Sequence, residues 1–218
     1  MIYDAHIHAI GNEKGGFIIG LEGVPCYKGT LSNEGALALH NPEKNYISFY
    51  YVTNEEKEEI IIHKYLKYHP RREGYTPEQV VESIKINKPK AVIIDTLNEP
   101  FWTAYDYWNV AKSAPKINFI FAHAGGYLIN DFIKICHFQP NVWIDFALTH
   151  TTLGKLGDQD GLEYISDAIH YSLRSPFKNR VLLSSDYPFF NQEDVFEYYK
   201  KDIELLNSNF EYLLNIIK

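Results

Sequence analysis

With 218 residues, 45% of them hydrophobic, and a net charge of −7, the chain has the length of one ordinary α/β domain, although a full eight-fold barrel typically needs about 250 residues. The acidic balance argues against the concentrated Lys and Arg patch of a nucleic-acid-binding protein, and no apolar run approaches the roughly 18–20 residues of a membrane span. Because the N-terminus also lacks a signal peptide and the two cysteines lack metal-ligand spacing, we expect a single cytoplasmic domain, residues 1–218, without nucleic-acid or membrane partners.

Short β-branched or aromatic runs alternate along the chain with amphipathic segments of helical length. Strands separated by helices of about 10–15 residues are the signature of βαβ units and of a parallel sheet. The predicted strands are residues 2–8, 46–52, 59–68, 91–95, 117–122, 141–146 and 180–185. The predicted helices begin near Pro77, Trp102, Leu128, Gly161 and Gln192. The pattern therefore predicts an α/β fold built on one parallel sheet.

Residues 9–45 interrupt this alternation. They hold seven glycines and few runs that are typical of a strand or a helix. Residues 16–20 either form a short strand, which would bring the number of strands to eight, or belong to a long loop over the site, which would leave a trimmed barrel. We therefore expect the fold to be shortened or distorted in its first third.

The first predicted strand ends in two histidines, His6 and His8. Residues i and i+2 of a strand point to the same face, so both imidazoles lie on one side. Two imidazoles at the carboxyl end of a strand can bind one divalent ion, and this end is where barrel enzymes carry their catalytic groups. The pair is therefore the first candidate for a metal site.

A second candidate residue follows the buried apolar strand at residues 117–122. His123 comes directly after that strand and is followed by the small, turn-forming residues AGG. In a parallel sheet its side chain reaches the same edge as His6 and His8. A histidine there either belongs to the site or only bonds loop carbonyls, and the strand pattern by itself leaves both interpretations open.

The last predicted strand leads into Asp186, which precedes Tyr187 and Pro188. A single aspartate after a strand is usually the N-cap of the next helix. In a closed barrel, however, the first and last strands are neighbours, so Asp186 would lie beside His6 and His8. This geometric consequence makes the combination of strand-end residues stronger evidence for a site than any one of them.

The motifs DAHIH, FAHAGG and SSDYPF together resemble the amidohydrolase superfamily, in particular its amidohydrolase 2 branch of barrel hydrolases and non-oxidative decarboxylases. The resemblance extends from residue 3 to about 189, and the closing run NFEYLLNIIK resembles the last helix of the family. It implies a TIM-like (β/α)8 barrel with a divalent metal, most commonly Zn²⁺, which lowers the pKa of a bound water to about 7. It also implies residue roles: His6 and His8 as metal ligands, Asp186 as ligand and proton carrier, and His123 as the group that polarises the substrate or orients the water.

One position departs from the family pattern. Members usually carry a metal-binding histidine at the end of the strand before FAHAGG, whereas this chain has Asp95 there. An aspartate can bind zinc but favours a harder ion such as Mn²⁺. Alternatively Asp95 does not reach the metal, and the site is weakened or is completed by His123, His69 or Glu99.

The run YLKYHPRREGY, residues 65–75, is the predicted substrate-binding segment. Tyr65, Lys67 and His69 share one strand face, and Arg71 and Arg72 follow in the loop, where a guanidinium can hold a carboxylate or phosphate through two hydrogen bonds. A solvated basic loop is the alternative for these arginines. Beyond this segment, Trp102 either lines the pocket or packs against the barrel rim. The predicted substrate-binding residues are His69, Arg71, Arg72 and Trp102.

These residues predict a metal-dependent hydrolase that cleaves a C–N, ester or lactone bond in a small polar, anionic molecule. A non-oxidative decarboxylase would use the same site, and a degenerate barrel that only binds its ligand is the alternative without catalysis. TatD-like nucleases and polymerase-and-histidinol-phosphatase barrels also begin with DxHxH, but their later motifs fit less well. The resemblance leaves a homodimer open, and the loops that set specificity leave the substrate unnamed.

Overall fold

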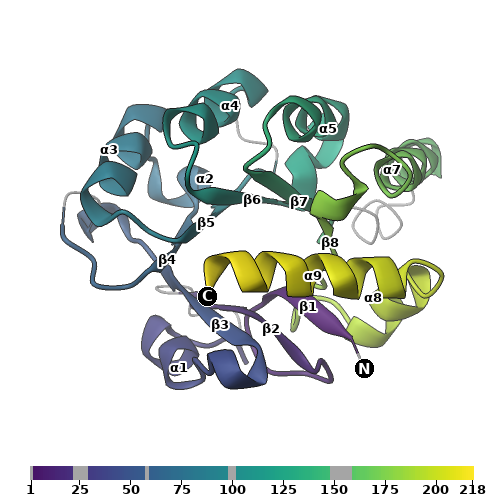
Figure 1. The fold of residues 1–218 in the computed structure, drawn as a ribbon, viewed down its shortest axis with the longest axis horizontal. Helices are drawn as coiled ribbons and strands as arrows, with labels where there is room; N and C mark the ends of the chain where they lie inside the picture. Colours follow the sequence, from purple (N-terminus) through teal and green to yellow (C-terminus); the bar gives the residue numbers. More distant parts are fainter. Residues whose placement is uncertain (1, 22–28, 57–58, 98–101, 148–158) are drawn as a thin grey trace.

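Eight parallel strands form one nearly closed barrel in the computed structural model, which describes residues 2–21, 29–56, 59–97, 102–147 and 159–218 (Figure 1). Each strand pairs with the next along the chain. The strands are β1 (Tyr3–Ile7), β2 (Gly15–Ile19), β3 (Tyr46–Tyr51), β4 (Tyr65–Tyr68), β5 (Ala91–Asp95), β6 (Asn118–Ala122), β7 (Val142–Asp145) and β8 (Val181–Leu182). The predicted TIM-like barrel is confirmed.

The barrel closes between β1 and the residues that follow β8. Ala5 N donates to Leu183 O at 2.8 Å, and Asp186 N donates to His6 O at 2.9 Å. The predicted strand at 180–185 is therefore shorter than expected, because only Val181 and Leu182 pair with β7 and the residues after them bond to β1 instead.

Helices surround the barrel (Figure 1). They are α1 (Asn33–Ala38), α2 (Pro70–Glu73), α3 (Pro77–Asn87), α4 (Ala104–Ser113), α5 (Ile129–Phe138), α7 (Gln159–Ser172), α8 (Gln192–Tyr198) and α9 (Ile203–Ile217). Both α3 and α4 begin with a capping box, in which Thr76 and Thr103 accept from the backbone of the first turn and a side chain of that turn returns the bond. No helix in the described ranges has the length and apolar character needed to cross a membrane.

The first third of the chain is shortened, as predicted. Residues 16–20 do contribute a strand, β2, which brings the number to eight. The described connection between β1 and β2 contains no helix, and α1 has only six residues. Gly16 permits the tight β1–β2 contact, because a Cβ there would lie 2.4 Å from Asp4 O.

The predicted strand at 59–68 begins only at Tyr65. The preceding β-branched run is a surface loop, in which the side chains of Ile60 and Ile62 are 82% and 86% exposed. Ile61 N instead donates to Asn87 Oδ1 at 2.6 Å, so this backbone bonds to a helix residue and to no neighbouring strand. The strand propensity of isoleucine was a poor guide here because it reflects packing on a half-buried sheet, which these side chains lack.

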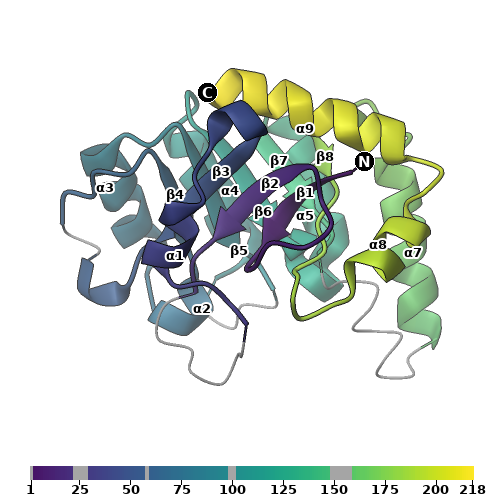
Figure 2. The same cartoon turned by 90° about the horizontal axis from the view of Figure 1, so that it is seen from below.

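Alternation along the strands divides most of the apolar side chains into two large clusters, beside a third small one formed by Ile7, Ile18 and Ala36. Outward-facing residues such as Val92 and Ile94 of β5 pack under the helices, and inward-facing residues such as Ala91 and Ile93 fill the barrel. The inner cluster also receives four side chains from α9: Phe210, Leu213, Leu214 and Ile217. Figure 2 shows that α9 lies across the end of the barrel from which β1 and β2 point away. The last helix therefore closes the amino-terminal end and leaves the carboxyl-terminal end for the site.

Candidate metal centre and its cavity

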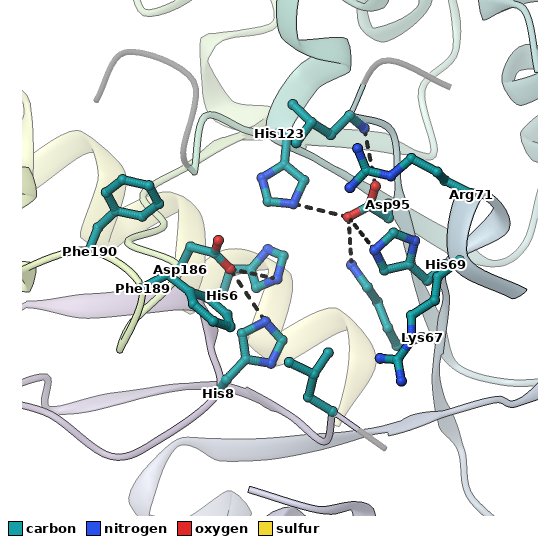
Figure 3. A pocket seen from close by; sticks show the side chains of 13 residues that line it. His6, His8, Lys67, His69, Arg71, Asp95, His123, Asp186, Phe189 and Phe190 are labelled. Carbon is teal, nitrogen blue, oxygen red and sulfur yellow. Dashed lines mark hydrogen bonds and ion pairs between the residues drawn. The ribbon is translucent and has the colours of Figure 1, made fainter. Parts of the chain in front are cut away.

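A cavity of about 610 Å³ opens at the carboxyl-terminal end of the barrel. Side chains from β1, β4, β5, β6 and the segment after β8 converge on it (Figure 3). The lining residues are His6, His8, Leu21, Lys67, His69, Arg71, Arg72, Asp95, Leu97, His123, Asp186, Phe189 and Phe190. Of the site residues predicted from the sequence, all but Trp102 line this one cavity.

The two histidines of β1 converge on Asp186. His6 Nε2 lies 3.5 Å and His8 Nε2 lies 3.3 Å from the same oxygen, Asp186 Oδ1. All three side chains are buried, and they form one of two histidine–carboxylate groups in the described chain that could hold a metal ion. A shift in the β1–β2 register between Asp4 and Ile7 accompanies the inward turn of His6 directly after the inward-facing Ala5.

The other ring nitrogens of these histidines are held by neighbours. His8 Nδ1 lies 2.9 Å from Ile19 O, and His6 Nδ1 lies 3.4 Å from Asp145 Oδ2. A ring nitrogen that faces an oxygen acceptor carries the proton, so each Nε2 presents a lone pair toward Asp186. Two lone pairs beside an ionised carboxylate are a donor set that a cation can bind.

A divalent metal fits this arrangement. Tetrahedral coordination at bond lengths of about 2.0–2.1 Å separates neighbouring ligand atoms by roughly 3.3 Å. The two separations, 3.3 and 3.5 Å, match that spacing. His6, His8 and Asp186 would hold the ion, and three protein ligands leave the open position that catalytic zinc sites keep.

The protonation states agree with metal binding. Burial and the nearby Lys67 charge lower the pKa of His6 to about 4, although Asp145 and Asp186 act in the opposite direction. Burial alone would raise the pKa of Asp186, but the neighbouring imidazole groups of His8 and His6 hold it below its usual range. At neutral pH the group therefore offers a neutral imidazole and an ionised carboxylate, which are the forms that bind metals.

Two site residues adopt the left-handed backbone conformation that non-glycine residues rarely enter. The φ angles are 67° at His123 and 63° at Asp186, and Ala124 follows with 43°. The turn continues into Gly125, where φ is 77° and a Cβ would lie 2.2 Å from the Phe132 ring. Such conformations cost roughly 1–3 kcal/mol each and cluster at functional sites, so these two positions are held for more than packing.

Asp145, at the end of β7, positions both histidine-bearing segments. Its Oδ2 accepts from His6 Nδ1, and its Oδ1 accepts from His123 N and Ala147 N at 3.0 Å each. His6, His123 and Asp145 form the second candidate metal group, but these hydrogen bonds already occupy the Asp145 oxygens. We did not predict this residue, although a carboxylate at a strand end, as at Asp95 and Asp186, was a signal for it.

His123 and Asp95 form a buried ion pair. His123 Nε2 lies 3.1 Å from Asp95 Oδ2, and its Nδ1 lies 2.9 Å from Ala147 O. Burial lowers the pKa of His123, but the Asp95 carboxylate outweighs it and raises the pKa to about 9. With an acceptor at each nitrogen, the ring is an imidazolium at neutral pH.

Asp95 lies outside the group formed by His6, His8 and Asp186, so the structure does not bring this predicted ligand together with the other three. The same oxygen that faces His123 also lies 3.5 Å from His69 Nε2 and 4.0 Å from Lys67 Nζ. Burial raises the pKa of Asp95, yet these neighbours hold it well below its usual range. Asp95 therefore balances the positive charge on its side of the cavity. Glu99, the other substitute considered, lies outside the described residues.

The predicted substrate-binding segment forms the cationic side of the cavity. His69, Arg71 and Arg72 line it, and Lys67 of β4 lies deeper, with 2% of its surface exposed. Burial lowers the pKa of Lys67, while the carboxylates of Asp95, Asp145 and Asp186 oppose that shift. The alternation of Tyr65, Lys67 and His69 indicated this inward direction, but Lys67 itself was not among the predicted site residues.

Trp102 does not line the cavity, which corrects its prediction. The indole is 3% exposed, its Nε1 donates to Tyr75 O at 2.8 Å, and its ring packs 4.8 Å from that of Tyr107. A buried indole with its one donor satisfied is part of the outer core.

The α/β barrel carries a histidine pair at the end of its first strand and an aspartate after its last strand, at the end where barrel enzymes carry their catalytic groups. The family model described as amidohydrolase matches residues 101–208, which confirms the predicted resemblance. No curated protein sequence matches the chain.

Solved structures share the barrel. An uncharacterized TIM-barrel protein from Bordetella bronchiseptica superposes with a TM-score of 0.66 at 16% identity, covering 94% of this chain and 79% of that one. A probable 2-pyrone-4,6-dicarboxylic acid hydrolase from Acinetobacter baumannii with citric acid bound gives 0.63 at 12% identity, with coverages of 98% and 99%. A 2,6-dihydroxybenzoate decarboxylase complexed with 2,6-dihydroxybenzoate gives 0.53 at 12% identity, with coverages of 85% and 75%. At these identities the likeness shows the fold alone.

Proposed function

We propose that the chain is a metal-dependent hydrolase that cleaves a C–N, ester or lactone bond in a small, polar, anionic molecule. The observation that carries this proposal is the convergence of His6 Nε2 and His8 Nε2 on Asp186 Oδ1, within a buried group that opens into the cavity. The family match and the hydrolase neighbour support the reaction class. The cationic residues that line the cavity support the anionic substrate.

The donor set favours zinc. Two imidazoles and one carboxylate are a common set of protein ligands in catalytic zinc sites, and Mn²⁺ was considered only because of Asp95, which lies outside the group. When bound, such an ion polarises a carbonyl and lowers the pKa of water to about 7.

The protein side chains supply the remaining steps. Asp186 accepts a proton at a carboxylate oxygen, since it is ionised and lines the cavity. The ring centroid of His123 lies 5.1 Å from that of His6, and the positive charge of His123 would stabilise an oxyanion that develops in the cavity beside these rings. Asp145 holds the His6 ring and the His123 backbone in place, because it accepts hydrogen bonds from His6 Nδ1 and His123 N.

Decarboxylation is the second candidate, because one solved neighbour is a 2,6-dihydroxybenzoate decarboxylase and the same pocket would bind an anionic aromatic acid. Product analysis separates the two reactions. Only the lyase releases carbon dioxide from a carboxylic acid, whereas the hydrolase consumes one water per bond cleaved.

Elemental analysis of protein purified without chelator tests the proposed site. The wild type is expected to carry about one equivalent of zinc, and the double variant His6→Ala/His8→Ala is expected to carry none. His170→Ala, an exposed histidine on α7, is the matched control and keeps its metal. A wild type without metal even after soaking in zinc or manganese would contradict the proposal and favour the barrel that only binds its ligand.

A further inference from the structure

The cavity has a different charge from the rest of the chain. The whole sequence carries a net charge of −7, yet the cavity is lined by Lys67, Arg71 and Arg72 against the two carboxylates of Asp95 and Asp186. An acidic protein that concentrates cationic groups in one pocket has a site suited to an anion.

Lys67 is the least expected of these groups. A lysine is almost never fully buried without a partner, and Lys67 is 2% exposed at the inner face of β4. Its Nζ has no hydrogen bond within the described residues, although an ammonium offers three donors. The carboxylate of Asp95 lies 4.0 Å away, beyond hydrogen-bond distance, and accepts from His123 at the same oxygen.

We propose that the Lys67 ammonium binds a carboxylate of the substrate, so that the chain acts on small carboxylic acids whose reacting bond lies at the His6, His8 and Asp186 side. This inference rests on the proposed function and adds the substrate class and the residue that selects it. In Figure 3 the Lys67 amine and the Asp186 carboxylate lie on either side of the cavity, with His69 beside Lys67. The cavity therefore fits a molecule with two different ends.

The charges around Lys67 act on a carboxylate and on a phosphate in the same sense. Asp95 keeps a negative charge 4.0 Å from the ammonium. A phosphate dianion would be repelled by that carboxylate, and attracted by the ammonium, about twice as strongly as a carboxylate monoanion, so the binding titration includes phosphate to distinguish the two. Arg71 lies at the exposed mouth of the same cavity, where a guanidinium can hold a second anionic group.

Calorimetric titration tests whether Lys67 binds a substrate carboxylate. The probes are succinate, glutarate and benzoate, each paired with its uncharged amide, and inorganic phosphate. Wild type is expected to bind at least one acid more tightly than its amide, and Lys67→Met is expected to raise the Kd of that acid about 10- to 100-fold, the loss of one charge-assisted hydrogen bond. Lys64→Met, an exposed lysine just before β4, is expected to leave every Kd unchanged.

Thermal unfolding of the same variants separates binding from a structural role. Lys67→Met replaces a buried amine that makes no hydrogen bond with an apolar chain of similar length, so the melting temperature is expected to rise by about 2–4 °C. A lower melting temperature in Lys67→Met and in Lys67→Gln would make the lysine structural and overturn the proposal. So would tighter binding of phosphate than of all three acids, or equal binding of acids and amides by wild type.

Metal content and turnover, measured on the same samples, keep this inference distinct from the hydrolase proposal. If wild type holds no metal but binds acids through Lys67, the hydrolase proposal fails and the proposed carboxylate binding by Lys67 stands. The opposite outcome is a wild type that holds metal, hydrolyses an uncharged ester as fast as Lys67→Met does, and shows no preference for acids. In that case the proposed carboxylate binding by Lys67 fails and the hydrolase proposal stands.

Discussion

The two ends of the barrel are lined by side chains of opposite polarity. At the amino-terminal end, the rings of Tyr3 and Phe17 stack on Phe210 of α9 with centroids 4.6 and 4.7 Å apart. At the carboxyl-terminal end, histidines, carboxylates and a lysine face one another in a cavity, and two residues there have left-handed backbones. Apolar contacts stabilise the barrel at one end, whereas the other end retains costly polar groups.

This contrast teaches where stability and chemistry reside in the molecule. In barrels of this kind the loops at the carboxyl ends of the strands carry the catalytic groups, and the opposite face contributes stability. Substitutions at the α9 end should therefore change the free energy of unfolding without changing the reaction per folded molecule. Substitutions in the cavity should mainly change the reaction and the binding of metal and substrate, with smaller effects on stability.

The largest effect is expected from Asp186→Asn. Loss of the shared carboxylate removes a ligand and the proton acceptor, so activity should fall about 10³-fold or more, while the melting temperature should fall no further than that of chelated wild type. Turnover, metal content and thermal unfolding check this together. Asp194→Asn, an exposed aspartate on α8, is the control and should behave as wild type. Full activity in Asp186→Asn would mean that the reaction does not take place in this cavity.

The opposite end gives the next effect. Phe210→Ala should lower the free energy of unfolding by about 3–5 kcal/mol, because it leaves a cavity among the rings of Tyr3 and Phe17. Urea denaturation measures the loss, and activity per folded molecule should stay constant. Ile216→Ala, half exposed on the same helix, should cost far less. A change in metal content in Phe210→Ala would mean that the two ends are coupled.

Removal of the metal should produce a smaller change, confined to the carboxyl-terminal end. A bound ion at a hundred times its Kd stabilises the folded state by about 2.7 kcal/mol. Chelation should then lower the melting temperature of wild type by roughly 5–10 °C. The double variant His6→Ala/His8→Ala should show no shift with chelator, and an equal shift in both proteins would place the metal elsewhere.

The smallest effect is expected in the helices that surround the barrel, away from both of its ends. Thr76→Ala removes the capping box of α3 and should lower the free energy of unfolding by about 1 kcal/mol, with metal content and activity unchanged. Thr76→Ser keeps the accepting oxygen and should restore most of that loss. Denaturation curves of both variants, measured side by side, decide the matter.

The sequence predicted that His6, His8 and Asp186 lie together because the rules behind this prediction are local. His6 and His8 follow from strand alternation, and Asp186 follows from the closure of a barrel between its first and last strands. Both rules need only the position of a strand end. The register shift in β1, which turns His6 inward directly after Ala5, depends on the pairing with β2 and left no trace in the sequence pattern.

The structure departs from the sequence predictions where tertiary contacts choose between side-chain orientations that local sequence rules do not distinguish. Trp102 could have faced the cavity or the core, and the acceptor at Tyr75 O together with the Tyr107 ring selects the core. Asp95 could have reached the metal, but His123 and His69 hold its carboxylate. Lys67 was on the right face, yet only the structure shows that its amine is buried without a hydrogen bond.

The closure of the barrel by α9 also has a consequence for the order in which the protein is made. Tyr3 N donates to Asn207 Oδ1, a residue 204 positions further along the chain, and Tyr3 stacks on Phe210. On the ribosome, the first strands emerge long before the helix that covers their apolar side chains. Such distant contacts slow folding and expose apolar surface to aggregation in the meantime. Nascent chains that end before α9 are therefore the species that we expect chaperones to bind.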